Sequence, residues 1–472
     1  MTVEVQSNGT HIADPLAAPK EEPVEAVDDL TELVKVETVA AAAEPNNADH
    51  REPEDDKEHT TLGSIMEKSS SFKEESYFLT DLKDHEKKAL MDLKSMLEDA
   101  VANNDKLYDT EEEEENMKEG TRERGISLWG VTLVPTTKSP ESANVLLLKF
   151  LRAREFKERE AFDMIRNTLR WRKECKVDSI LEESSLGAGP CKSGACFVAG
   201  RDREGRPVCY NVFGAFGDAE SYRKAFGTEE RRKELLRWRV RVMEEGIREL
   251  EFRPGAAASF VQVIDLKNSP GVSKKELRIA TREAVQLLQD NYPEFVAKNI
   301  FINVPFWFYA FSALISPFLT LRTRSKFVFA RPWRVTETLL KYIPAENIPV
   351  SYGGLKREGD VEFSGGDDVA ITELVVKAGS TENVEIPLPQ AETTLVWDLT
   401  VLGWEVNYKE EFVPFDEGSY TIVIQKPKKI GYQEETIRNS YKNSEPGKVV
   451  LAIENSSYKK KRVLFRCKAN NC

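Results

Sequence analysis

The chain has 472 residues, of which 40% are hydrophobic and 31% charged, and its formal net charge is −13. All four histidines lie at or before position 85, and the six cysteines include no CxxC pair. This removes histidine-dependent triads, histidine general bases and histidine metal ligands from most of the chain, so we expect neither an enzyme nor a metal site.

The acidic charge is concentrated in the N-terminal part of the chain. Residues 1–140 carry 15 Lys+Arg and 34 Asp+Glu, whereas Glu141–Asp360 carries 38 and 29. Up to Ser71 the sequence is rich in Glu, Ala, Pro and Asp and poor in aromatic residues, so it cannot bury enough apolar surface to offset the entropy of ordering. We therefore expect residues 1–71 to form a disordered acidic arm. No cationic, apolar signal sequence opens the chain, which indicates a cytosolic protein.

Helices are predicted after the arm. Leucine and methionine recur at helical spacing between Tyr77 and Ala102, which indicates an amphipathic helix. The acidic run Glu111–Glu115 is then either a solvated linker or a screen for the basic domain that follows. Ser139 and Pro140 supply an N-cap and a first-turn proline for a helix through Arg154, and Ala161–Cys175 continues as a second helix.

Arg154 ends the apolar stripe of its helix. Each residue of one set lies three or four positions from two others, so the set shares one face of the helix: Leu147, Phe150, Leu151 and Arg154. On spacing alone, the arginine has a structural explanation, because a cation at this position complements the C-terminus of the helix.

Strands and helices alternate in the middle of the chain. Ala195–Val198 and Val208–Val212 predict a hairpin, and the apolar strand Phe260–Ile264 ends at Asp265. The helix from about Thr228 to Phe252 interleaves arginine with glutamate, so a solvated, salt-bridged helix is favoured over a surface that tracks nucleic-acid phosphates. Ser273 and Glu276 form a capping-box pattern for the next helix, which runs to Asn291. This alternation predicts an α/β domain around a mostly parallel sheet.

The most apolar stretch runs from Ile300 to Leu321 and carries no charge, which is long enough to suggest a membrane span. Pro305 and Pro317 argue against a span, because each proline interrupts a helix. The stretch therefore divides into a strand, Ile300–Val304, and an aromatic helix, about Phe306–Ser316. Apolar side chains cover most of that helix, so it needs a second partner: protein core, a membrane surface or a bound lipid.

After Gly354 the pattern changes to period two. Alternating segments such as Thr393–Leu399, Val401–Tyr408 and Val449–Glu454 are separated by turn-rich sequence, which predicts a β-sandwich. A predicted hairpin near the end carries Lys459, Lys460, Lys461 and Arg462. Four adjacent cations either protect a sheet edge from aggregation or bind an anionic leaflet.

Four motifs resemble the CRAL-TRIO family of lipid carriers: LLLKFLRAREF (Leu146–Phe156), GRDREGRPV (Gly200–Val208), the stretch from YPEF at Tyr292 to SKFVF ending at Phe329, and IPAENIPVSYGG (Ile343–Gly354). The C-terminal segment resembles a GOLD domain, and LWGV at Leu128–Val131 fits the patellins, plant proteins that combine both domains. The resemblance implies a helical cap with an acidic linker at residues 77–180, a CRAL-TRIO α/β lipid-binding domain at 186–356 and an all-β GOLD sandwich at 360–472.

The resemblance also implies the site. Phosphoinositide headgroup contacts fall on Arg154, Glu294, Thr323 and Lys326, and the lipid cavity or its gate on Phe306, Trp307, Phe308, Phe311, Leu314, Ile315, Phe260 and Gln262. Two departures disfavour choline-lipid exchange: Glu155 follows Arg154 where transfer proteins often carry lysine, and Phe260 and Gln262 replace hydroxyl-bearing residues.

The function implied is that of a cytoplasmic, peripheral membrane carrier with no cofactor other than a bound lipid and no nucleic-acid partner. By resemblance, it binds phosphoinositides and anionic membranes at the plasma membrane or cell plate, and it acts in membrane traffic, including cell-plate formation in cytokinesis. The alternative is an adaptor with a purely structural cavity, which recruits protein partners through the GOLD domain and the arm.

Overall fold

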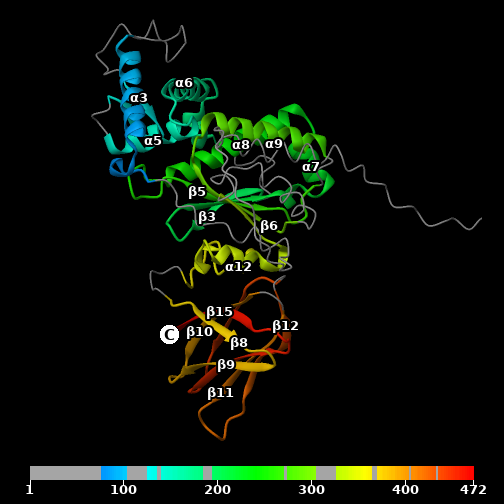
Figure 1. Cartoon of the computed structure of the whole chain (residues 1–472). Helices are drawn as coiled ribbons and strands as arrows, with labels where there is room; N and C mark the ends of the chain where they lie inside the picture. Colours follow the sequence, from blue (N-terminus) through cyan, green and yellow to red (C-terminus); the bar gives the residue numbers. More distant parts are fainter. Residues whose placement is uncertain are drawn as a thin grey trace, which may run out of the picture.

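The computed structural model describes residues 76–103, 125–135, 140–183, 194–270, 274–304, 326–363, 369–402, 405–431 and 434–471. The predicted acidic arm (1–71), the run Glu111–Glu115 and the predicted gate helix all lie outside the described residues. The predicted order of helical cap, α/β domain and β-sandwich is confirmed (Figure 1).

The helical cap opens the described chain. Its helix α5 is buried at every position from Ala143 to Arg152, because α3 and α6 and the β1–β2 hairpin all pack around it. The turn of that hairpin places Trp129 among core residues of the cap. The elements are η1 (Leu79–Asp81), α3 (Asp84–Ala102), β1 (Ile126–Leu128), β2 (Val131–Val134), α5 (Pro140–Ala153), α6 (Glu158–Glu174) and η2 (Val177–Glu182).

The middle domain is built on a five-stranded sheet of order β3-β4-β5-β6-β7. The β3–β4 hairpin is antiparallel, as predicted, and the remaining pairs are parallel. Helices α7, α8 and α9 lie on one side of this sheet and α12 on the other (Figure 1). The strands are β3 (Cys196–Arg201), β4 (Pro207–Val212), β5 (Phe260–Asp265), β6 (Val296–Ile302) and β7 (Phe327–Phe329).

Side chains at the helix ends account for where two of these helices begin. Asp218 caps α7 by accepting hydrogen bonds from two backbone amides, and Thr228 does the same for one amide of α8. The helical segments are η5 (Phe213–Phe216), α7 (Ala219–Phe226), α8 (Glu229–Arg248), α9 (Lys275–Asn291), η7 (Pro332–Arg334), α12 (Val335–Leu340), η8 (Ala345–Asn347) and η9 (Val350–Tyr352).

The C-terminal domain is a sandwich of two four-stranded antiparallel sheets, β13-β10-β15-β8 and β12-β11-β14-β9. Its core contains a buried carboxylate, Glu410, which accepts hydrogen bonds from Trp397 (3.2 Å), Tyr408 (2.7 Å) and Asn439 (2.6 Å). The strands are β8 (Thr372–Val376), β9 (Ser380–Leu388), β10 (Thr393–Leu402), β11 (Val406–Pro414), β12 (Ile422–Ile430), β13 (Ile437–Lys442), β14 (Gly447–Asn455) and β15 (Lys461–Asn471).

The segment that links the two domains is held by an ionic cluster. Asp398 of β10 is fully buried and accepts hydrogen bonds from Arg438 (2.7 and 2.8 Å) and Arg466 (2.8 Å). Arg438 also binds Asp360 of the linking segment with both terminal nitrogens, at 2.7 and 2.8 Å. Arg466 donates to the carbonyl of Leu355 at 2.8 Å, so one arginine joins the sandwich to the end of the middle domain. We call Asp360, Asp398, Arg438 and Arg466 the Asp398 cluster.

One predicted strand is wrong. The predicted strand Val401–Tyr408 is the end of β10 and the start of β11, which belong to different sheets, and the period-two pattern does not mark the crossing. Ser273 of the predicted capping box lies outside the described residues, while Lys274 is the N-cap of α9 and the Glu276 carboxylate accepts a hydrogen bond from Tyr222 at 2.9 Å.

We predict that Asp398→Ala destabilises the protein by about 3–5 kcal/mol, because it removes the buried carboxylate that pairs with Arg438, Arg466 and, at 3.5 Å, Arg357. Urea unfolding followed by tryptophan fluorescence measures this, since Trp397 is fully buried in the sandwich core. Glu373→Gln is the matched control: its pair with Arg462 is about 40% exposed, and its loss should cost less than about 1 kcal/mol. Equal effects of the two substitutions would contradict the structural importance of the cluster.

The Asp398 cluster also predicts an acid sensitivity. Hydrogen bonding to Arg438 lowers the pKa of Asp360 from 3.8 to about 2. A depressed carboxyl pKa contributes stability above the unfolded value, and that contribution is lost as the pH falls from about 4 towards 2. Thermal melts between pH 5 and 2 should therefore show a steeper loss of stability for the native chain than for Asp360→Asn, and parallel curves would argue against the contribution of this carboxylate.

Candidate functional site

Two of the four predicted headgroup residues lie together. Lys326 Nζ donates a hydrogen bond to Glu294 Oε2 at 3.1 Å, and the two side chains are 23% and 10% exposed. Glu294 precedes β6, and Lys326 directly precedes β7, the strand that pairs with β6. The two residues thus flank β6 and the predicted gate in sequence, and the gate itself lies outside the described residues.

The other headgroup residues are less well placed by the structure. Arg154 directly follows α5, is half-buried and donates a hydrogen bond to the carbonyl of Ala153 at 3.2 Å. Within the described part of the chain it shares no hydrogen bond or ion pair with Glu294 or Lys326. Thr323 lies outside the described residues, as do the predicted gate residues Phe306, Trp307, Phe308, Phe311, Leu314 and Ile315.

Phe260 and Gln262, the two predicted cavity residues that the structure describes, lie on one face of β5 and are 2% and 8% exposed. Phe260 packs into the hydrophobic core shared with the cap. Gln262 pairs with Cys209 of β4, and Cys209 lies two residues before Asn211 in that strand. Among the described residues, the buried amide nitrogen of Asn211 has no hydrogen-bond partner, and sequence reasoning missed this polar feature of the face.

The backbone of Glu294 is unusual. Its φ is 53°, in the left-handed region that is unfavourable for residues other than glycine. Its carbonyl oxygen accepts a hydrogen bond from Lys149 Nζ at 2.8 Å, and Lys149, in α5, is completely buried. Sequence reasoning did not identify Lys149, although a lysine inside the apolar run LLLKFL is a signal that could have identified it.

A second buried polar centre lies close to Glu294. Glu244 of α8 accepts hydrogen bonds from Arg172 (2.6 Å), Tyr292 (2.6 Å) and Trp129 (3.2 Å). Although burial disfavours its charged form, hydrogen bonds to Glu244 and Asp178 raise the pKa of Arg172. Burial, reinforced by the charge of Glu244, raises the pKa of the Tyr292 hydroxyl, which therefore remains a proton donor at neutral pH.

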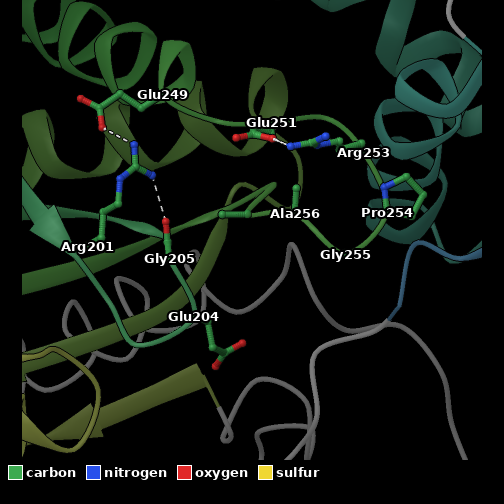
Figure 2. A pocket seen from close by; sticks show the side chains of 10 residues that line it. Arg201, Glu204, Gly205, Glu249, Glu251, Arg253, Pro254, Gly255 and Ala256 are labelled. Carbon is green, nitrogen blue, oxygen red and sulfur yellow. Dashed lines mark hydrogen bonds and ion pairs between the residues drawn. The ribbon is translucent and has the colours of Figure 1, made fainter.

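A recess of about 470 Å³ opens between the β3–β4 turn and the loop before β5 (Figure 2). Arg201 lies 3.1 Å from Glu249 and donates to the carbonyl of Gly205, while Arg253 pairs with Glu251 (Figure 2). Because Glu204 adds a third carboxylate against two arginines, the lining residues carry a net negative charge. This recess is therefore poorly suited to an anionic headgroup.

The four cations predicted near the last hairpin occupy different environments. Lys459 and Lys460 are exposed in the β14–β15 turn, next to Tyr458, which is 86% exposed. Lys461 is buried, and burial lowers its pKa. Arg462 binds Glu373 through two nitrogens, at 2.5 and 2.9 Å.

The fold and these residues define a CRAL-TRIO lipid-binding protein with an appended GOLD domain. Residues 78–167 match the CRAL/TRIO N-terminal domain, 191–354 the CRAL/TRIO domain and 377–461 the "Patellin-1-like, C-terminal GOLD domain". The chain is 45% identical to Patellin-4 of Arabidopsis thaliana, over 85% of this chain and 90% of that protein, and 46% identical to Patellin-3 of the same plant, over 85% and 78%. A SEC14 cytosolic factor of Eremothecium gossypii is 34% identical over 46% of this chain and 70% of its own.

The chain belongs to the patellin family. It is thus a non-enzymatic protein with a domain for hydrophobic ligands. Among the helices of the described residues, none combines the length and the apolar character that crossing a bilayer requires.

Proposed function

We propose that this protein is a peripheral membrane carrier that binds a phosphoinositide in a closed cavity and transfers or presents it during membrane traffic, including cell-plate formation. The observation that carries the proposal is the ion pair between Glu294 and Lys326, which brings together two predicted headgroup residues, one before β6 and one before β7. The trafficking role rests on the relationship to patellins alone.

The chemistry of the pair suits a phosphorylated inositol. An ammonium group forms charge-assisted hydrogen bonds with phosphate oxygens, and a carboxylate accepts hydrogen bonds from ring hydroxyls. Both side chains are largely buried but not sealed, so a headgroup that enters here meets two polar groups in a poorly solvated place. Arg154 and the predicted contact Thr323 complete the proposed site.

The energetics assign separate roles to cavity and headgroup. Burying two acyl chains contributes about 0.8 kcal/mol for each methylene, which sums to more than roughly 20 kcal/mol for a typical lipid. A headgroup ion pair contributes only a few kcal/mol after desolvation. We therefore assign affinity to the apolar cavity, with Phe260, Gln262 and the six predicted gate residues in its walls, and lipid choice to the headgroup residues.

The membrane contact that we propose is the β14–β15 turn. Lys459 and Lys460 are exposed there beside Tyr458, and an aromatic ring with adjacent cations suits an anionic membrane surface. Lys461 and Arg462, which were predicted with them, contribute less to the proposed membrane contact. Lys461 is buried, and Arg462 is bound to Glu373.

The adaptor is the alternative function. In that case the cavity holds no lipid and the GOLD domain recruits protein partners. Native mass spectrometry of the purified protein distinguishes the two functions. A copurifying lipid supports the carrier, whereas a measured mass equal to that of the polypeptide alone supports the adaptor.

We expect Lys326→Ala to reduce phosphoinositide affinity roughly ten- to hundredfold, because it removes a charge-assisted contact worth about 1.5–3 kcal/mol. The substitution also leaves Glu294 without this cation, so the empty protein should lose some stability. Adding Glu294→Gln should restore part of the stability but not the binding. Vesicle transfer assays with a labelled phosphoinositide and an uncharged labelled lipid measure the selectivity.

Lys275→Ala, which removes an exposed lysine at the start of α9, is the matched control and should leave both transfer rates unchanged. If Lys326→Ala reduces transfer of the two lipids equally, or of neither, the headgroup site lies elsewhere.

We further expect Lys459→Gln with Lys460→Gln to weaken pelleting with anionic liposomes roughly thirtyfold at low salt, at about 1 kcal/mol for each lysine, while lipid occupancy of the cavity persists. Lys442→Gln with Lys448→Gln removes the same charge from the opposite end of the sandwich and should have a smaller effect. If Lys459→Gln with Lys460→Gln leaves pelleting unchanged at every salt concentration, the two lysines protect the sheet edge and do not bind the membrane.

A further inference from the structure

Lys149 is fully enclosed between the helical cap and the sheet domain. Its Nζ donates hydrogen bonds to the Glu294 carbonyl oxygen at 2.8 Å and to the Tyr77 hydroxyl at 3.1 Å. The ammonium also lies 4.7 Å from the ring centroid of Phe295 and 5.3 Å from that of Tyr77. A buried ammonium is costly unless its hydrogens are used, so these contacts fix the groups around it as firmly as they fix the lysine.

The contact with Glu294 matters because of the backbone at that residue. A φ of 53° is unfavourable for a glutamate and persists only where the surroundings enforce it. The left-handed conformation sets the direction in which the carboxylate leaves the main chain, and that carboxylate meets Lys326. Lys149 holds the carbonyl of the same residue, so it constrains the peptide that aims the carboxylate.

Tyr77 connects this arrangement to the N-terminal end of the described chain. Its hydroxyl binds Lys149, and its ring lies 4.6 Å below the guanidinium of Arg152, one turn further along α5. Arg152 also donates to the carbonyl of Ser76 at 2.5 Å. Lys149 and Arg152 therefore hold the same N-terminal segment, and Lys149 donates a further hydrogen bond to the Glu294 carbonyl.

We propose that Lys149 is a positioning residue for headgroup selection, an inference that rests on the proposed function. Lys149 keeps Glu294 in the conformation that presents its carboxylate to Lys326 and the headgroup. Through its second hydrogen bond, to Tyr77, it makes this geometry depend on the seating of the segment that follows the acidic arm. The cap thus takes part in lipid choice although it supplies this contact from outside the headgroup site.

The test compares Lys149→Met with Arg152→Met in the full-length protein. Both remove a buried cation that holds Ser76–Tyr77, and both should lower the melting temperature. Only Lys149→Met should lower the ratio of phosphoinositide to uncharged-lipid transfer, by about fivefold, because only it releases the Glu294 carbonyl. Combined with Lys326→Ala, Lys149→Met should add no further loss of selectivity, since the two act through one carboxylate.

Tyr77→Phe provides a milder variant if Lys149→Met does not fold. It removes one hydroxyl, keeps the ring under Arg152, and should lower the transfer ratio about twofold with little change in melting temperature. A transfer ratio that Lys149→Met and Tyr77→Phe leave unchanged, or that Arg152→Met lowers as much, would overturn the inference.

Lys326→Ala alone separates this inference from the proposed function. If Lys326→Ala leaves the ratio unchanged, the proposed headgroup site fails and the role of Lys149 fails with it. If Lys326→Ala lowers the ratio and Lys149→Met does not, the headgroup site stands and only the positioning role is lost.

Discussion

The cap and the sheet domain meet at one buried carboxylate, Glu244, and the geometry of the candidate site depends on that junction. Glu244 binds Arg172 from α6, Tyr292 from the end of α9 and Trp129 from the β1–β2 turn. The Trp129 ring also packs against Tyr292 and Phe295, at centroid distances of 5.9 and 4.8 Å. Glu294 lies between these two aromatic residues in sequence, so its position is fixed on both sides by contacts with the cap.

Buried charged groups also fix the position of the GOLD domain. The apolar contact between the domains is small, a cluster of Ala345, Leu355, Leu402 and Leu464 with a few flanking residues. The orientation of one domain relative to the other is set instead by two arginines. Arg466 donates a hydrogen bond to the carbonyl of Leu355, and Arg357 donates one to the carbonyl of Thr436, each across the domain boundary. Hydrogen bonds from buried charged groups are directional and costly to break on one side only, so they specify an orientation that apolar packing leaves loose. The β14–β15 turn is part of the domain that is oriented in this way.

Local pattern predicted the elements well where one signal dominated. The apolar run before Asp265 correctly predicted β5, and Pro140 correctly predicted the start of α5. Glu294 and Lys326, residues that the structure brings together, were identified by resemblance to a motif, not by periodicity. The remaining features depend on long-range partners: Lys149 lies 145 residues before the carbonyl it binds, and Asp398 looks like an outward-facing polar residue until Arg438 and Arg466 are seen around it. Sequence order does not reveal which segments will cover a buried charge.

Under the proposed function, the preformed pair has a consequence for selectivity. Lys326 already holds the Glu294 carboxylate at 3.1 Å, so a phosphate gains only the difference between its own contact with Lys326 and that of Glu294. A neutral headgroup gains nothing from displacing the pair, and a second phosphate oxygen can gain more by recruiting Arg154. The site therefore discriminates by differences of a few kcal/mol, while the acyl chains supply most of the binding free energy.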